Sequence, residues 1–251
     1  MNILGIDVGG SGIKGALVDL GTGELASERI RIETPGSFEM ETVGETMAAL
    51  VRELGHSGPI GVGFPAAVAE GIVLTPPTAH EFPGWVGHSV NDAFSRASGC
   101  DVTVLNDADA AGLAEVKFGA GRGVNGVVIT VTLGTGVGAG LFMDGKLVPN
   151  LEIGKLFLSN HDDVVEQYMA GRIKKEHDLK WLEYGERLNE FCLHVEHIFS
   201  PQLIIIGGGI SKKHKKFLPA SQPSRTRVVP AELRNQAGIV GAACWAAETI
   251  E

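Results

Sequence analysis

The chain has 251 residues, of which 44% are hydrophobic and 6% aromatic, and its formal net charge is −9. This length and apolar content suffice for one large domain or two smaller lobes, while the acidic balance disfavours non-specific binding of nucleic acid. The apolar runs are too short to cross a bilayer, no secretion signal is expected, and three scattered cysteines favour a reducing cytoplasm.

Apolar periodicity predicts alternating strands and helices along the chain. The first half is predicted to contain strands at 2–7 and 16–19, a helix at 41–54, a strand at 60–64, a helix at 90–98, a strand at 102–105 and a helix at 108–117. The second half is predicted to contain strands at 126–133 and 139–143, helices at 162–173 and 181–199, a strand at 203–206 and a helix at 239–247. Together with the 35 glycines, this order favours an α/β fold.

A strand, a glycine turn and a second strand occur twice in the sequence. The two copies are residues 7–19 and 132–144, and both ends are displaced by 125 positions (132 − 7 and 144 − 19). Under this offset Gly9 aligns with Gly134. The repeat predicts two lobes of similar topology, with chance similarity between two glycine-rich hairpins as the alternative.

Three glycine-rich loops each follow a predicted buried strand. Glycine lets several backbone N–H groups point into one small volume, and such arrangements bind phosphate oxygens. The first loop matches neither the Walker A motif nor the dinucleotide fingerprint. The candidate phosphate ligands are Gly9, Gly10, Ser11, Gly12, Lys14, Thr132, Gly134, Thr135, Gly136, Gly207, Gly208 and Gly209.

Two charged residues flank the first glycine loop. Asp7 ends the first predicted strand, where a carboxylate is suited to hold Mg²⁺ through water, or simply to cap the turn. Lys14 follows the loop and either contacts a phosphate or is solvated. Both pairs of alternatives remain open on the sequence alone.

Polar residues suited to a sugar hydroxyl occur at three places. Asn106 and Asp107 end a predicted strand, where Asp107 is a candidate general base and Asn106 a candidate ligand of a neighbouring hydroxyl. The alternative is a helix N-cap, for which both residue types are favoured. Glu152 is a candidate acceptor for sugar hydroxyls or a surface residue, and Trp85 either shapes a sugar pocket or packs a loop.

A basic run follows the third glycine loop of this acidic chain. It consists of Lys212, Lys213, Lys215 and Lys216 around His214. The run is either a track for a long polyanion or a solvated surface.

These motifs, in this order, resemble those of the ROK sugar kinases (repressors, open reading frames and kinases). The matching segments are residues 7–14 and 132–138 for the phosphate motifs, 106–111 for the catalytic stretch and 204–211 for the adenosine motif. Within that family the chain is similar to the polyphosphate glucokinases, in segments 61–65, 106–115, 207–213, 217–219 and 228–243.

The resemblance implies an α/β, two-lobed, actin-like or hexokinase-like (RNase H-like) fold with a central cleft. The expected N-terminal lobe is 1–107, with a helix at 238–251 packing back on it, and the expected C-terminal lobe is 108–237. The implied reaction transfers phosphate from polyphosphate or ATP to the 6-hydroxyl of glucose, with Mg²⁺ and in a homodimer. By position Asp107 is the catalytic base, Asn106 and Glu152 hold the sugar, and Gly63 lies beside it.

The chain departs from the family pattern at three points. Lys155 stands where ROK kinases commonly have histidine, and His80 where similar enzymes tend to have asparagine, so both are candidate sugar contacts of altered selectivity. The cysteine-rich zinc motif is missing, so no structural zinc is expected. Alternatives are an ATP-dependent ROK hexokinase for mannose, fructose or N-acetylmannosamine, and a non-catalytic sugar-binding protein. A repressor is disfavoured, because the first expected strand starts at Asn2.

Overall fold

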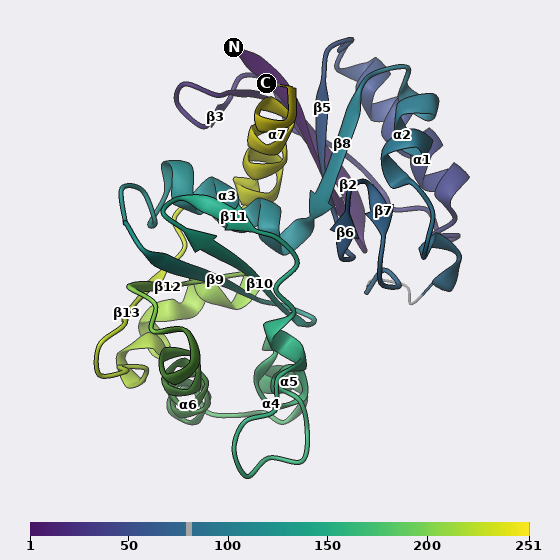
Figure 1. Cartoon of the computed structure of the whole chain (residues 1–251). Helices are drawn as coiled ribbons and strands as arrows, with labels where there is room; N and C mark the ends of the chain where they lie inside the picture. Colours follow the sequence, from purple (N-terminus) through teal and green to yellow (C-terminus); the bar gives the residue numbers. More distant parts are fainter. Residues whose placement is uncertain (79–81, 251) are drawn as a thin grey trace. The chain divides into compact units, whose positions relative to one another are not determined.

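The computed structural model describes residues 1–78 and 82–250, which form two compact units (Figure 1). The first unit comprises Met1–Ala114 with Gln236–Glu251, and the second comprises Glu115–Asn235. The first boundary therefore falls inside helix α3 (Asp107–Phe118), after Ala114, rather than after Asp107 as expected.

The first unit is built on a mixed sheet in the order β3-β2-β1-β5-β8, with β4 also pairing with β2. Strand β1 runs antiparallel to β2 but parallel to β5, which is parallel to β8. The carboxyl ends of these three parallel strands therefore meet at one edge. The strands are β1 (Asn2–Gly9), β2 (Gly12–Asp19), β3 (Glu24–Leu25), β4 (Ile30–Ile32), β5 (Ile60–Phe64) and β8 (Val102–Asn106).

Helices cover both faces of this sheet. Side chains alternate along β1, so Leu4 and Ile6 pack with α1 (Met40–Glu53) in the core, while Gly5 faces α7 (Ala237–Ile250). Figure 1 shows α7 on one side of the sheet and α1 with α2 (Val90–Ser98) on the other. The remaining elements are the short β6 (Val68–Ala69) and β7 (Ile72–Val73) and the 3₁₀ turn η1 (Pro83–Trp85).

Helix α7 approaches its neighbours so closely that only glycine fits at three contacts. A Cβ atom on Gly5 or Gly61 would overlap a backbone carbonyl of α7. A Cβ atom on Gly241, in α7 itself, would overlap the carbonyl oxygen of Ala110 in α3. These contacts attach the last helix to the first sheet and to α3.

The second unit contains a sheet in the order β11-β10-β9-β12-β13. Its strands are β9 (Val127–Leu133), β10 (Val137–Met143), β11 (Lys146–Val148), β12 (Leu203–Gly207) and β13 (Arg227–Pro230). Its helices are α4 (Val165–Met169), α5 (Gly171–Glu176) and α6 (Trp181–Phe199), with 3₁₀ segments η2 (Ile153–Lys155), η3 (Gly209–Lys216), η4 (Leu218–Ala220) and η5 (Arg234–Gln236). The single helix predicted at 162–173 is wrong, because Ala170 adopts an extended backbone (φ −54°, ψ 151°) that separates α4 from α5.

The two sheets share one topology, which confirms the repeat predicted from the sequence. In each, an antiparallel hairpin is followed by two parallel strands, β2-β1-β5-β8 and β10-β9-β12-β13. The pairing within the hairpins differs by one residue. Gly9 pairs with Gly12, whereas Leu133 pairs with Val137, so the second turn is one residue longer.

Candidate active site

Strand register gathers three of the predicted residues at one edge of the first sheet. Asp7 in β1 lies opposite Gly63 in β5, and the next residue of β5, Phe64, lies opposite Asn106 in β8. A Cβ atom on Gly63 would lie 3.6 Å from the Cα atom of Asp107. Gly63 therefore packs against the start of α3, next to the candidate base.

Asn106 caps a helix, which is one of the two alternatives predicted for it from the sequence. Its Oδ1 accepts hydrogen bonds from the backbone N–H groups of Ala108 (2.9 Å) and Asp109 (3.2 Å). Its Nδ2 donates to the carbonyl oxygen of Ala66 at 3.1 Å, leaving one amide hydrogen for another acceptor. The cap fixes Asp107, which is partly exposed, as the first residue of α3.

The first glycine turn carries two cations, one of which the sequence did not reveal. Lys14 is not simply solvated, because its Nζ donates to Asp7 Oδ2 at 3.2 Å. Arg31 in β4 lies opposite Lys14, and its guanidinium donates to the carbonyl oxygen of Ser11 in the turn. Only strand pairing brings Arg31 here, so no local motif could have indicated it.

Asp7 fits a magnesium ion held mainly by water and phosphate. Within residues 1–78 and 82–250, no three His, Cys, Asp or Glu side chains are grouped to hold a metal ion. A single, partly exposed carboxylate beside a glycine turn suits Mg²⁺, which keeps several waters and usually takes one or two carboxylates plus substrate phosphates.

The second and third glycine loops lie side by side in the second unit. Thr132 at the end of β9 pairs with Gly207 at the end of β12. Gly208 has a positive φ of 78° and packs against the backbone of Leu133, where a Cβ atom would overlap it. The predicted phosphate ligands of both loops are thus brought to one place.

Three charged side chains cluster next to the second glycine loop. Lys155 Nζ lies 3.6 Å from Glu166 Oε1, and Glu166 Oε2 accepts a 3.1 Å hydrogen bond from the N–H of Val137. Partial burial raises the pKa of Glu152, an effect that Lys155 opposes and Glu166 reinforces. Lys155 is thus paired with a carboxylate that the sequence motifs had not singled out.

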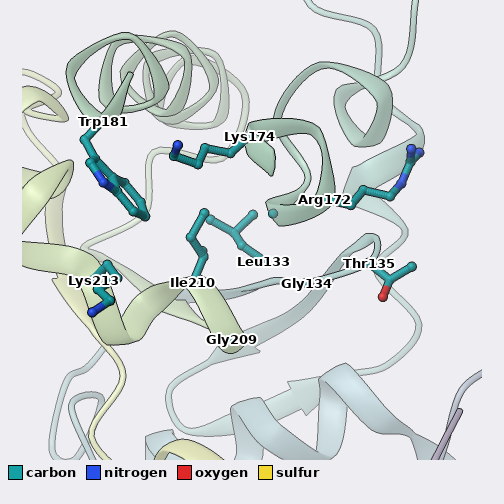
Figure 2. A pocket seen from close by; sticks show the side chains of 10 residues that line it. Leu133, Gly134, Thr135, Arg172, Lys174, Trp181, Gly209, Ile210 and Lys213 are labelled. Atoms are coloured by element: carbon teal, nitrogen blue, oxygen red, sulfur yellow. The ribbon is translucent and has the colours of Figure 1, made fainter. Parts of the chain in front are cut away.

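A pocket of about 410 Å³ opens beside the same loops (Figure 2). Its size is typical of small-molecule sites. Three cations line it, and no carboxylate does so among the described residues. The lining residues are Leu133, Gly134, Thr135, Gly171, Arg172, Lys174, Trp181, Gly209, Ile210 and Lys213.

The pocket includes residues that no sequence motif indicated. Arg172 and Lys174 come from α5 and Trp181 from the start of α6. Of the predicted basic run only Lys213 lines the pocket, while Lys216 Nζ lies 5.7 Å from the Trp181 ring centroid. The exposed Lys212 and Lys215 belong to the same segment, η3, but not to the lining.

The sugar contact considered for Trp85 needs correction. Its side chain is fully buried, its Nε1 donates to the carbonyl oxygen of Phe38 at 2.7 Å, and its ring packs 4.7 Å from that of Phe64. Trp85 therefore packs the loop, the second alternative, and offers a sugar no exposed surface. His80 lies outside the described residues.

Comparison with known proteins identifies the family. The sequence profile of the ROK family matches residues 3–151. The polyphosphate glucokinase of Mycobacterium tuberculosis (strain CDC 1551 / Oshkosh) is 42% identical over 240 residues, covering 95% of this chain and 89% of that protein. The chain belongs to the ROK family.

Solved structures agree with the fold. The inorganic polyphosphate/ATP-glucomannokinase of Arthrobacter sp. strain KM superposes with a TM-score of 0.91 at 43% identity, over 99% of both chains. A ROK family glucokinase of Streptomyces griseus, solved with glucose and AMPPNP, is similar in fold, with a TM-score of 0.82 at 24% identity over 99% of this chain and 100% of that one. The expected actin-like, hexokinase-like α/β fold is confirmed. Across residues 1–78 and 82–250, no helix is long and apolar enough to span a membrane.

Proposed function

We propose that the protein transfers a phosphoryl group from inorganic polyphosphate, and also from ATP, to the 6-hydroxyl of glucose. One observation carries the proposal: Asn106 and Asp107 are intact and fixed at the strand edge in a chain 42% identical, over 95% of its length, to a polyphosphate glucokinase. A non-catalytic sugar-binding protein would not need a carboxylate held in this way.

Asp107 acts as the general base in this proposal. Its carboxylate accepts the proton of the 6-hydroxyl while the hydroxyl oxygen attacks the terminal phosphorus of the donor. The bond between that phosphorus and its bridging oxygen breaks, and the donor leaves one phosphate shorter. Each glycine loop offers backbone N–H groups to phosphate oxygens, the loop at Gly9 in the first unit and the loop at Gly134 in the second.

Asp7 would hold Mg²⁺ through water, and the bound ion would offset charge on the donor phosphates. Lys14, now paired with Asp7 at 3.2 Å, and Arg31 are the protein cations at the same turn. In the second unit, Glu152 and Glu166 offer acceptors and Lys155 a donor for hydroxyls of the sugar.

The test is a matrix of donors and acceptors. The purified protein is assayed with glucose, mannose, fructose and N-acetylmannosamine, each with polyphosphate and with ATP, in the presence of Mg²⁺. The proposal expects glucose phosphorylation with polyphosphate to have the highest kcat/KM. Activity with ATP alone on another sugar would instead support an ATP-dependent ROK hexokinase, and binding of sugar without turnover would support a sugar-binding protein.

Two further parts of the proposal are the metal and the assembly. Removal of Mg²⁺ with a chelator is expected to abolish turnover, and added Mg²⁺ to restore it. A homodimer is expected by analytical ultracentrifugation. Activity in the presence of the chelator would contradict the Mg²⁺ requirement, and a monomer at assay concentration would contradict the homodimer.

A further inference from the structure

The pocket of the second unit has two chemically different ends. Figure 2 shows Thr135, in the glycine loop, on the side of the pocket opposite Trp181. The loop end offers backbone N–H groups and a hydroxyl, as a reacting phosphate requires. With the reacting phosphate at the loop end, the tail of the donor extends toward Trp181.

Other side chains already contact the faces of the Trp181 ring. The ring of Phe217 stacks on it, with centroids 5.9 Å apart and an interplanar angle of 17°. Lys174 Nζ lies over it at 4.7 Å from the centroid, and Figure 2 shows these two side chains pointing toward one another. A nucleobase that stacked on the pocket side of Trp181 would have to displace the ammonium group of Lys174.

The ammonium groups at this end have no compensating carboxylate. In the described part of the chain, neither Lys174 nor Lys213 forms an ion pair, whereas Arg172 is engaged by Glu176 at 3.3 Å. Uncompensated ammonium groups favour an anionic ligand. A nucleoside tail is uncharged, while every further unit of a polyphosphate tail carries negative charge.

We infer that Lys174, seated on the ring of Trp181, selects the donor by favouring a phosphate tail over a nucleoside tail. The inference rests on the proposed function, which places the reacting phosphate at the Gly134 loop. It assigns to α5 a specificity role that the basic run at 212–216 alone does not explain.

The decisive variant is Lys174→Met, with Lys175→Met as its control. Lys175 is the next residue of α5, is exposed and does not line the pocket. Loss of one charge-assisted phosphate contact is expected to lower kcat/KM for polyphosphate about tenfold in Lys174→Met. The value for ATP should stay constant or rise, and Lys175→Met should change neither. An equal loss with both donors, or an unchanged value for polyphosphate, would overturn the inference.

Direct binding separates this inference from the proposed function. Calorimetric titration with polyphosphate of defined length, and separately with ATP, is done without sugar, so turnover is not needed. If no donor phosphorylates glucose, the proposed function fails, yet about tenfold weaker polyphosphate binding by Lys174→Met still supports the role of Lys174. Equal polyphosphate affinity of wild type and variant overturns it.

A second variant, Trp181→Leu, tests the ring. Without the indole ring beneath it, the ammonium group of Lys174 loses its fixed position. The affinity for polyphosphate should then fall, while the affinity for ATP is retained. If ATP affinity falls as much or more, the ring stacks the nucleobase and the inference is wrong.

Discussion

Asn106 caps the helix that Asp107 begins, through hydrogen bonds from the N–H groups of Ala108 and Asp109 to its Oδ1. The same side chain donates to the carbonyl oxygen of Ala66, just beyond β5. One amide thus ties together the strand edge and the helix start, and the position of the candidate base depends on it.

Replacement of Asp107 by Asn is expected to lower kcat by about 10²–10⁴-fold, because the proton acceptor is lost while the shape is kept. Circular dichroism and the melting temperature should match the wild type. Asp101→Asn, at an exposed residue just before β8, is the control and should keep full activity. Near-wild-type turnover of the Asp107 variant would contradict the assignment.

Asn106→Ala should lower the free energy of unfolding by about 1 kcal/mol, the usual effect of losing an N-cap. Urea unfolding measures this change. Asn106→Asp keeps an oxygen acceptor for the two N–H groups, so its stability should lie closer to that of the wild type. Equal destabilisation by Ala and Asp would mean that capping is not what Asn106 contributes to stability.

Lys155→Ala should move the acid limb of the pH profile to higher pH. Lys155 lowers the pKa of Glu152 against the raising effects of partial burial and Glu166, so its removal raises that pKa further. The carboxylate proposed to accept sugar hydroxyls is then lost at a higher pH. The measurement is kcat/KM for glucose as a function of pH, with the exposed Lys146→Ala as control. A higher KM for glucose with an unchanged acid limb of the pH profile would show that Lys155 acts by direct contact alone.

Glu196→Gln should destabilise the second unit at neutral pH. Desolvation alone would raise the pKa of this buried carboxyl, but hydrogen bonds from Ser224 and the N–H groups of Arg225 and Thr226 lower it to about 2. Because the pKa of Glu196 is depressed in the folded protein, its carboxylate stabilises the fold at pH values above the ordinary pKa of 4.5. This stabilisation is lost as the pH falls toward 2.

The gap in urea midpoint between wild type and Glu196→Gln should therefore be full at pH 7 and shrink below about pH 4.5. Glu186→Gln, at an exposed position of the same helix, is the control and should show little change. A gap that is the same at pH 7 and pH 3 would contradict the electrostatic origin.

Gly241→Ala should destabilise the first unit by about 1–3 kcal/mol, because the added methyl group meets the backbone of Ala110, which cannot rotate away. Gly36→Ala is the matched control, since a Cβ atom there meets nothing within 4 Å. Chemical unfolding of both variants checks the difference. A Gly241→Ala protein as stable as the control would show that α7 sits less tightly than the contacts indicate.

Much of the fold could be predicted because the elements carry clear apolar periods. The helices at Val90–Ser98 and Trp181–Phe199 and the strand at Ile60–Phe64 have the predicted bounds. The single helix expected at 162–173 was wrong, because the apolar spacing continues through Ala170 whereas the helical backbone is interrupted there. Likewise, the aligned glycines of the repeat concealed the one-residue difference between the two hairpins.

The candidate site divides in the same way. Residues within continuous motifs, such as Asp107 and Gly134, could be predicted because their spacing along the chain carries the signal. Arg31 and Lys174 could not, since each reaches its place only through strand pairing or helix packing. Trp85 was ambiguous because a Phe-Pro-Gly-Trp segment reads alike whether the indole faces a ligand or the core.

The packing of α7 against β1 and β5 also has a consequence for folding during synthesis. The second unit ends at residue 235, directly before α7. One face of the first sheet therefore stays uncovered while the whole second unit is made, although its strands are translated first. Since domains fold as units, the first unit is completed only when α7 packs on its sheet, and until then its N-terminal strands expose a face that favours aggregation.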